Sequence, residues 1–340
     1  MSRQTILLLF GGESSEHDVS LKSACNVYAA LDGQKYDVLL GYIDKSGKWW
    51  LVESLQNDME DHGGSQLLAA LGLGSFLTLP GNKVVHPDVI FPVLHGANGE
   101  DGTVQGLAEL LHVPIVGCDT TSSAVCMDKV MTKQIAKSIG VATADWLLIN
   151  KGESLPSYQQ VQDQLGSILF VKPARSGSSV GVSRVTNQAE FVSAVDQAFL
   201  HGRRVVIEQE IVGREIETAV LGNPPDHKVS GVGEIIAGND FYDYEDKYAI
   251  DSQSQTIDQA DLDEDLSEKI RQTSIQIYSA LGCSGLARID YILKDDRPYL
   301  IEVNTLPGFT NISMYPKLWR VEGLRYSDLV DELIDMATKK

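Results

Sequence analysis

Short apolar runs alternate with amphipathic stretches through the first third of the chain. The runs at 5–10, 36–43, 48–52, 88–95 and 113–117 end near Gly, Asp or Pro, which predicts buried β-strands. Residues 14–31 show helical periodicity, with Ser14 or Ser15 as the expected N-cap. Because strands that alternate with helices form parallel sheets covered on both faces, we expect a doubly wound parallel sheet here. Its ligands should bind beyond the strand ends, where Gly11-Gly12 and His95-Gly96 stand.

The pattern changes after Gly117. Residues 122–140 predict one long helix, and residues 167–185 predict a strand, a Gly/Ser-rich loop and a second strand. From Gly213 onward the strand-like runs follow one another closely, which indicates an antiparallel α+β region. We therefore place domain boundaries near residues 118 and 210, each uncertain by several residues. The expected domains are residues 1–118, 119–210 and 211–340.

Charge and composition narrow the function classes. The 340 residues include 47 Asp and Glu against 28 Lys and Arg, a formal net charge of −19. Such an acidic surface repels phosphate backbones, so we expect no nucleic-acid partner. No apolar run approaches the roughly 20 residues of a membrane span, so we expect no membrane partner. The four cysteines show no metal-ligand spacing, and we expect reduced thiols in a cytoplasmic protein.

The loop 176–181, SGSSVG, follows Lys172 between two predicted strands. Small residues let backbone N–H groups approach phosphate oxygens closely, so this loop is a candidate phosphate site. A flexible hairpin turn is an equal alternative on this stretch alone. The chain contains no GxxxxGK[ST] pattern, and no GxGxxG follows the first strand, which excludes a P-loop enzyme and argues against a dinucleotide dehydrogenase.

The stretch 286–304, LARIDYILKDDRPYLIEVN, predicts a β-hairpin. Strand alternation places Arg288 and Asp290 on one face, and puts Leu300, Glu302 and Asn304 on one face of the returning strand. With the turn centred on Asp296, Asp290 faces Glu302 and Arg288 faces Asn304. Oxygen ligands of this kind suit Mg²⁺. The alternative is a solvated face on which Arg288 neutralises the acids.

Several stretches together resemble one family. They are GGESSEHDVS, HGANGEDGTVQG, VKPARSGSSVGV, FYDYEDKY, ARIDY and LIEVNTLPGFT, in this order from about Leu7 to Tyr315. This chain closely resembles the D-alanine–D-alanine ligases of the ATP-grasp superfamily. The resemblance implies an N-terminal α/β domain followed by the two α+β lobes of an ATP-grasp fold, with ATP held between the lobes.

The resemblance also implies roles for residues at the matched positions. For ATP these are Lys129, Lys172, Ser179, Glu208, Glu215 and Lys247. For Mg²⁺, which Mn²⁺ could replace, they are Asp290, Glu302 and Asn304. Around the two D-alanines it implies Glu16, Ser178, Tyr248, Arg288 and Ser313 as catalytic residues, and His95 and Gly308 as substrate contacts.

The implied reaction is ATP-dependent ligation of two D-alanines through an acyl phosphate, for peptidoglycan precursors. We expect the polar segment 239–256 to act as a mobile lid. We also expect a homodimer. Two alternatives stay open: a ligase that makes an ester or joins a different second amino acid, and a nucleotide-binding regulator without catalysis. For residues 53–82 the sequence suggests no functional role.

Overall fold

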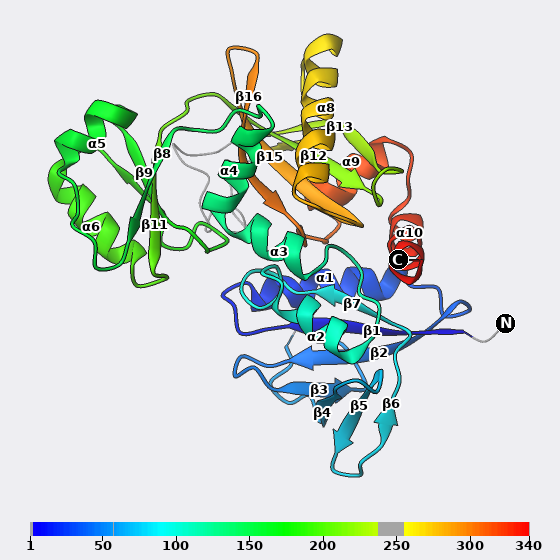
Figure 1. Cartoon of the computed structure of the whole chain (residues 1–340). Helices are drawn as coiled ribbons and strands as arrows, with labels where there is room; N and C mark the ends of the chain where they lie inside the picture. Colours follow the sequence, from blue (N-terminus) through cyan, green and yellow to red (C-terminus); the bar gives the residue numbers. More distant parts are fainter. Residues whose placement is uncertain (1–2, 57, 237–254, 340) are drawn as a thin grey trace.

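The computed structural model describes residues 3–56, 58–236 and 255–339 and contains three β-sheets within them (Figure 1). The division of the chain at residues 118 and 210 stays a prediction. The predicted segment 239–256 lies outside the described residues, apart from Gln255 and Thr256, which begin a short strand.

The first sheet has seven strands in the order β6-β5-β4-β3-β2-β1-β7. Its parallel part consists of β1 (Gln4–Gly11), β2 (Tyr36–Ile43) and β7 (Val89–Val93). Antiparallel strands β3 (Trp49–Val52), β4 (Ser65–Ala70), β5 (Ser75–Leu79) and β6 (Val84–Val85) extend it. The sheet is therefore mixed, and much of the stretch 53–82 forms its antiparallel edge.

Strand β1 is buried on both faces. Ile6, Leu8 and Phe10 pack in one core cluster with residues of α1 (His17–Ala30), whereas Leu7 and Leu9 pack in another with residues of α2 (Thr103–Leu111). This two-sided burial explains the uninterrupted apolar run and confirms the doubly wound arrangement.

Three predictions about local structure were wrong in detail. The N-cap of α1 is Glu16, because the Ser14 hydroxyl instead donates a 2.6 Å hydrogen bond to the His95 carbonyl oxygen. Residues 113–117 form only an isolated bridge between Ile115 and Ile90. The expected single helix at 122–140 is divided at Asp128 into α3 (Thr120–Met127) and α4 (Lys129–Ser138).

The second sheet has the order β10-β9-β11-β8 and comprises β8 (Trp146–Asn150), β9 (Leu169–Pro173), β10 (Ser183–Val185) and β11 (Arg204–Gln209). Residues of α5 (Tyr158–Leu165) and α6 (Gln188–Ala198) share its main core cluster. Val130 of α4 packs with Ala174 and Val206 in a separate small cluster. Figure 1 shows this unit, in green, at one end of the molecule.

The third sheet is antiparallel, as predicted, with the order β14-β13-β12-β15-β16. Its strands are β12 (Arg214–Leu221), β13 (Lys228–Ile236), β14 (Gln255–Ile257), β15 (Leu286–Lys294) and β16 (Arg297–Asn304). Helix α8 (Glu264–Ala280) shares a core cluster with it, while α9 (Met314–Val321) and α10 (Tyr326–Thr338) join the core of the first sheet. No helix in the described part of the chain is long and apolar enough to cross a lipid bilayer.

Candidate active site

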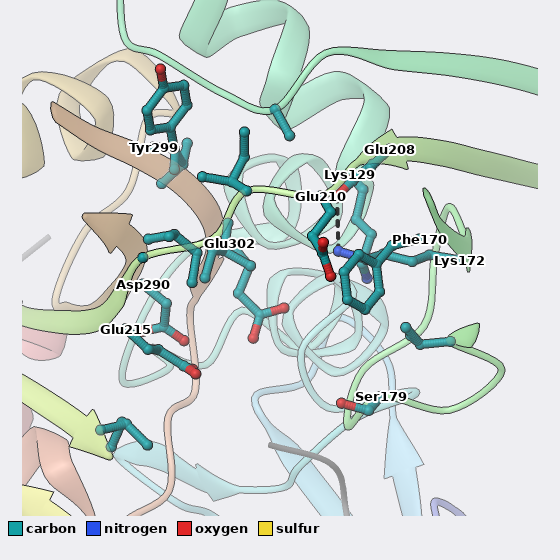
Figure 2. A pocket seen from close by; sticks show the side chains of 18 of the residues that line it. Lys129, Phe170, Lys172, Ser179, Glu208, Glu210, Glu215, Asp290, Tyr299 and Glu302 are labelled. Atoms are coloured by element: carbon teal, nitrogen blue, oxygen red, sulfur yellow. Dashed lines mark hydrogen bonds and ion pairs between the residues drawn. The ribbon is translucent and has the colours of Figure 1, made fainter. Parts of the chain in front are cut away.

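A cavity of about 490 Å³ lies between the second and third sheets (Figure 2). Phe170, Lys172 and Glu208 line it from the second sheet, and Asp290 and Glu302 line it from the third. Eight of the predicted site residues line this one cavity: Lys129, Lys172, Ser178, Ser179, Glu208, Glu215, Asp290 and Glu302. Residues far apart in the sequence are thus brought together in one space large enough for a small ligand.

Three lysines and Glu208 form what we term the lysine cluster: Lys129, Lys133, Lys172 and Glu208. The Lys172 Nζ lies 2.8 Å from Glu208 Oε2, and the Lys133 Nζ lies 3.2 Å from Glu208 Oε1. Burial alone would raise the pKa of Glu208, but the positive charges of Lys133 and Lys172 lower it to about 2. Glu208 is therefore a permanent negative charge at neutral pH. Figure 2 shows Glu208 and Lys172 side by side, linked by a dashed line.

The helix break at Asp128 positions Lys129. The Asp128 carboxylate caps α4 by accepting from the backbone N–H groups of Val130 and Met131, and it pairs with Arg204 at 2.6 Å. Lys129 is thereby the first residue of α4, and its Nζ donates a 2.6 Å hydrogen bond to the Ser176 carbonyl oxygen. Burial lowers the pKa of Lys129. The capped helix start thus connects a half-buried lysine to the Gly/Ser loop.

The Gly/Ser loop bends sharply next to this lysine. Ser178 and Ser179 have φ of 52° and 56°, the left-handed region that side chains rarely adopt. Such conformations cost about 1–3 kcal/mol each and are frequent at functional sites. A Cβ placed on Gly177 would lie 3.9 Å from Gly96 Cα and 4.0 Å from oxygens of both Glu16 and Glu100. The loop therefore connects the cavity with the N-terminal sheet.

The hairpin register agrees with the prediction, although its turn does not. Asp290 faces Glu302 and Arg288 faces Asn304. The turn is formed by Asp295 and Asp296, both with positive φ, and is shorter than expected. A β-bulge compensates, because Tyr291 pairs with Leu300 and leaves Ile301 as the extra residue. Leu300 therefore packs in the same core as Val303. We had expected Leu300 to share a face with Glu302, and this prediction was wrong.

The Asp290 carboxylate is fixed by two neighbours. Arg288 donates to both of its oxygens at 2.8 Å, and the Asn304 side-chain amide donates to Oδ2, also at 2.8 Å. Arg288 also lies 3.2 Å from Glu217. Burial lowers the pKa of Arg288, but Asp290 and Glu217 outweigh it and raise the pKa well above its usual value. Arg288 is therefore a permanent cation beside the acidic side of the cavity.

A second group of charged residues, the acid cluster, consists of Glu16, His95 and Glu100. His95 Nδ1 lies 3.9 Å from Glu100 Oε1 and 3.2 Å from the Leu306 carbonyl oxygen, and Nε2 lies 3.2 Å from Ser23 Oγ. Burial is the main cause that raises the pKa of Glu100, and the charge of Glu16 adds to it. Burial lowers the pKa of His95, but contacts with Glu100 and the charge of Glu16 outweigh it and raise the pKa.

Gly308 and Ser313 also come together. A Cβ on Gly308 would lie only 2.9 Å from Ser313 Oγ, so a side chain at residue 308 would collide with it. The Ser313 hydroxyl is 2.8 Å from Thr310 Oγ1 and accepts from the Thr310 N–H at 3.0 Å, and Ser313 is the N-cap residue of α9.

The residues predicted to hold a divalent cation are Asp290, Glu302 and Asn304; Asp290 and Glu302 line the cavity, and both Asp290 oxygens accept hydrogen bonds from Arg288. Among the described residues, no group of three or more His, Cys, Asp and Glu side chains gathers closely enough to hold a metal. Two carboxylates and one amide oxygen nevertheless fit Mg²⁺, which commonly takes one or two carboxylates and completes its shell with substrate phosphates and water.

Sequence reasoning missed two charged residues of this region, Lys133 and Glu100. Lys133 follows Lys129 by four residues, the spacing that puts two side chains on one helix face, and this signal was available. Glu100 stands within the quoted motif HGANGEDGTVQG. Two predicted site residues, Lys247 and Tyr248, lie outside the described residues.

Comparison with known proteins gives a consistent result. Residues 5–118 match the family model "D-ala D-ala ligase N-terminus", and residues 135–335 match "D-ala D-ala ligase C-terminus". The chain is 45% identical to the D-alanine–D-alanine ligase of Sodalis glossinidius (strain morsitans), covering 98% of this chain and 95% of the relative. It is 40% identical to D-alanine–D-alanine ligase A of Escherichia coli (strain K12), and the match covers 100% of this chain and 97% of that relative.

Solved structures agree. VanG D-Ala:D-Ser ligase from Enterococcus faecalis superposes with a TM-score of 0.90 at 34% identity, covering 99% of this chain and 100% of that one. The D-alanine-D-alanine ligase from Coxiella burnetii gives a TM-score of 0.87 at 35% identity, covering 99% and 96%. With both family models and full-length relatives in agreement, the chain belongs to the D-alanine–D-alanine ligase family.

Proposed function

We propose that this protein joins two molecules of D-alanine into D-alanyl-D-alanine for peptidoglycan precursors, converting ATP to ADP and phosphate. The observation that carries the proposal is the cavity itself, where the lysine cluster on one side faces Asp290 and Glu302 on the other. Cations beside carboxylates are the arrangement that a metal–triphosphate needs. Membership of the family supports the same reaction.

In the proposed mechanism, the carboxylate of the first D-alanine attacks the γ-phosphorus of ATP, giving an acyl phosphate and ADP. The neutral amine of the second D-alanine then attacks the acyl carbon, and inorganic phosphate leaves. Lys129, Lys172 and the Ser178–Ser179 turn would hold the phosphates, while Glu208 and Glu215 would accept hydrogen bonds from adenine and ribose. Arg288 and the Gly308 N–H would stabilise the tetrahedral oxyanion.

We assign the two D-alanine sites to the region between the cavity and the N-terminal sheet. Glu16, His95, Ser178 and Ser313 would contact the amino acids, supported by the approach of Gly177 to Glu16. Tyr248 and Lys247 complete this assignment from the segment 239–256, which we propose as the lid that excludes water from the acyl phosphate.

We assign Mg²⁺ to Asp290, Glu302 and Asn304. The ion would supply positive charge to the β- and γ-phosphates. Glu302→Gln should keep the fold and lower kcat/KM by orders of magnitude, with Mg²⁺ affinity reduced about 10–100-fold. Glu322→Gln, on a carboxylate outside the cavity that accepts from the Gly231 N–H, is the matched control. Near-normal turnover of Glu302→Gln at saturating Mg²⁺ would refute the assignment, as would equal losses in both variants.

The central experiment is an amino-acid panel. The protein is incubated with ATP, Mg²⁺ and D-alanine, L-alanine, D-serine or D-lactate, and phosphate release and product mass are measured. We expect phosphate release that requires D-alanine and a product of the mass of D-alanyl-D-alanine. A non-catalytic regulator would instead bind ATP without amino-acid-dependent turnover.

One observation favours a second candidate, the joining of D-alanine to D-serine. The structure with a TM-score of 0.90 is described as a D-Ala:D-Ser ligase. Tyr248 does not separate the two candidates, because D-alanine and D-serine both carry an ammonium group; in our assignment it favours an amino acid over a hydroxy acid such as D-lactate. An excess of D-alanyl-D-serine from an equal mixture of D-alanine and D-serine would replace our proposal with this one.

We also propose a cytoplasmic homodimer. None of the four cysteines, all of which lie within the described residues, forms a disulfide, which agrees with a reducing compartment. Leu71, Leu73 and Leu110 are 57%, 71% and 60% exposed, and the turn between β4 and β5 is bonded to the end of α2 through Gly72 N–H and the Leu110 carbonyl oxygen. Exposed apolar clusters of this kind are frequent at subunit contacts. Light scattering should give twice the chain mass, and Leu73→Lys should lower it.

A further inference from the structure

Lys133 is a buried cation whose position calls for a function. It lies one turn after Lys129 on α4, and its side chain is only 3% exposed. Burial lowers the pKa of Lys133, and the charge of Glu208 opposes this effect. Lysine is rarely buried without a purpose, because removing an ammonium group from water is costly unless a counter-charge accompanies it.

Glu208 divides its two oxygens between two lysines that differ in access. Oε1 faces Lys133 and Oε2 faces Lys172. The Lys172 side chain is 16% exposed, against 3% for Lys133, and both line the cavity. A ligand that enters the cavity therefore reaches Lys172 more easily. The two ion pairs are not equivalent, and the outer one is the one that a ligand can replace.

The charges indicate what happens when Lys172 turns towards an anionic ligand. Glu208 then keeps Lys133 as its partner, so no buried carboxylate is left without a cation. If Lys133 were absent, the departure of Lys172 would leave Glu208 buried and unpaired, which is strongly unfavourable. Lys172 would then be held on Glu208 and would be less available for phosphate.

We propose that Lys133 is a positioning residue: it shares the Glu208 carboxylate with Lys172 so that Lys172 can leave Glu208 to bind a nucleotide phosphate. This inference rests on the proposed use of ATP. It assigns Lys133 no contact with the nucleotide. Its effect should therefore depend mainly on the phosphates of the ligand, because Glu208, which we assign to adenine, is still present when Lys133 is replaced.

The test compares ADP with adenosine by isothermal titration calorimetry in the presence of Mg²⁺. For Lys133→Met we expect ADP affinity to fall about tenfold, while adenosine affinity changes less than about twofold. Lys137→Met is the matched control, because Lys137 follows on the same helix but is exposed, and it should leave both affinities unchanged. Lys133→Gln, which also removes the charge, should reproduce the result if the methionine variant does not fold.

A rescue experiment separates positioning from packing. Glu208→Gln in the Lys133→Met background removes the carboxylate that retains Lys172, so the ratio of ADP to adenosine affinity should return towards the wild-type ratio. Equal losses for ADP and adenosine, no loss at all, or a double variant with a still lower ratio would each overturn the inference. If the wild-type protein itself does not bind ADP, the proposed use of ATP fails instead.

Discussion

Glu208 is a buried carboxylate and Glu100 a largely buried one near the same cavity, yet their pKa values are shifted in opposite directions. Glu208 lies between Lys133 and Lys172, which lower its pKa to about 2. Among the described residues, Glu100 has His95 as its one nearby base, and the negative charge of Glu16 also lies close to it. Its pKa is raised. Burial acts on both in the same sense, so the number of neighbouring cations decides the outcome.

This contrast indicates that the lysine cluster and the acid cluster have different functions. In the lysine cluster, Glu208 stays ionised at neutral pH and pairs with Lys133 and Lys172, whose ammonium groups suit the binding of a polyanion. In the acid cluster, the pKa of Glu100 is raised to about 7, which suits a site where an ammonium group must bind and later lose a proton. The following predictions test this contrast, from the largest expected effect to the smallest.

Glu208→Gln should lower the free energy of unfolding by about 3–5 kcal/mol at pH 7, because it leaves two lysines without their buried counter-charge. The pKa of Glu208 is lowered in the folded state, so its stabilisation is present above the ordinary value of 4.5 and is lost as pH falls towards 2. Urea unfolding at several pH values should therefore show the gap between variant and wild type closing below pH 4.5. A difference in unfolding free energy between Glu208→Gln and wild type that does not change with pH would contradict the lowered pKa of Glu208.

Lys172→Met should lower kcat/KM for ATP by about 10²–10³, since one preorganised cation at the phosphates is lost. Lys228→Met is a matched control, because Lys228 pairs with Glu332 at 3.1 Å on the surface, away from the cavity. Steady-state kinetics at saturating D-alanine measure both variants. Similar values for the two would show that the lysine cluster does not serve the reaction.

Glu100→Gln should change the pH dependence of stability in the opposite sense to Glu208→Gln. The pKa of Glu100 is raised from 4.5 to about 7, so its favourable contribution is complete below pH 4.5 and is lost as pH rises through 7. Relative to wild type, the variant should therefore gain about 3 kcal/mol between pH 4.5 and 8. Thermal melts across this range measure the gain.

If the stability of Glu100→Gln relative to wild type instead falls or stays constant as pH rises, the acid cluster does not titrate as described. Asp163→Asn is a suitable control, because Asp163 is exposed on α5 and accepts only a surface hydrogen bond from Gln159. Its stability difference from wild type should be small across the range.

The sequence predicted much of this architecture because local patterns carry it. Two-sided burial made the first strand an uninterrupted apolar run. Strand alternation placed Arg288 and Asp290 on one face of the hairpin, and their neighbours Ile289, Tyr291 and Leu293 do pack in the core. The family motifs located the cavity residues, which lie on strands of the second and third sheets, on α4 and in the Gly/Ser loop.

What the sequence did not predict depends on tertiary contacts. The break at Asp128 requires Arg204 and the capping of α4, which no helical periodicity reveals. The antiparallel edge at residues 65–85 has weakly alternating strands that become ordered by pairing. The functional charge of Lys133 depends on Glu208, which is 75 positions further along the chain (208 − 133).

The bulge at Ile301 shows how one added residue changes what a sheet face offers. In a regular strand, neighbouring side chains point to opposite faces, so an apolar residue and an acid next to each other in sequence do not share a face. Here Ile301 and Glu302 do share one, because both are half-buried at the cavity while Leu300 and Val303 on either side are buried in the core. For an evolving or redesigned binding surface, a single-residue insertion is thus a means of adding an apolar wall beside a candidate metal ligand while the pairing of Asp290 with Glu302 is kept.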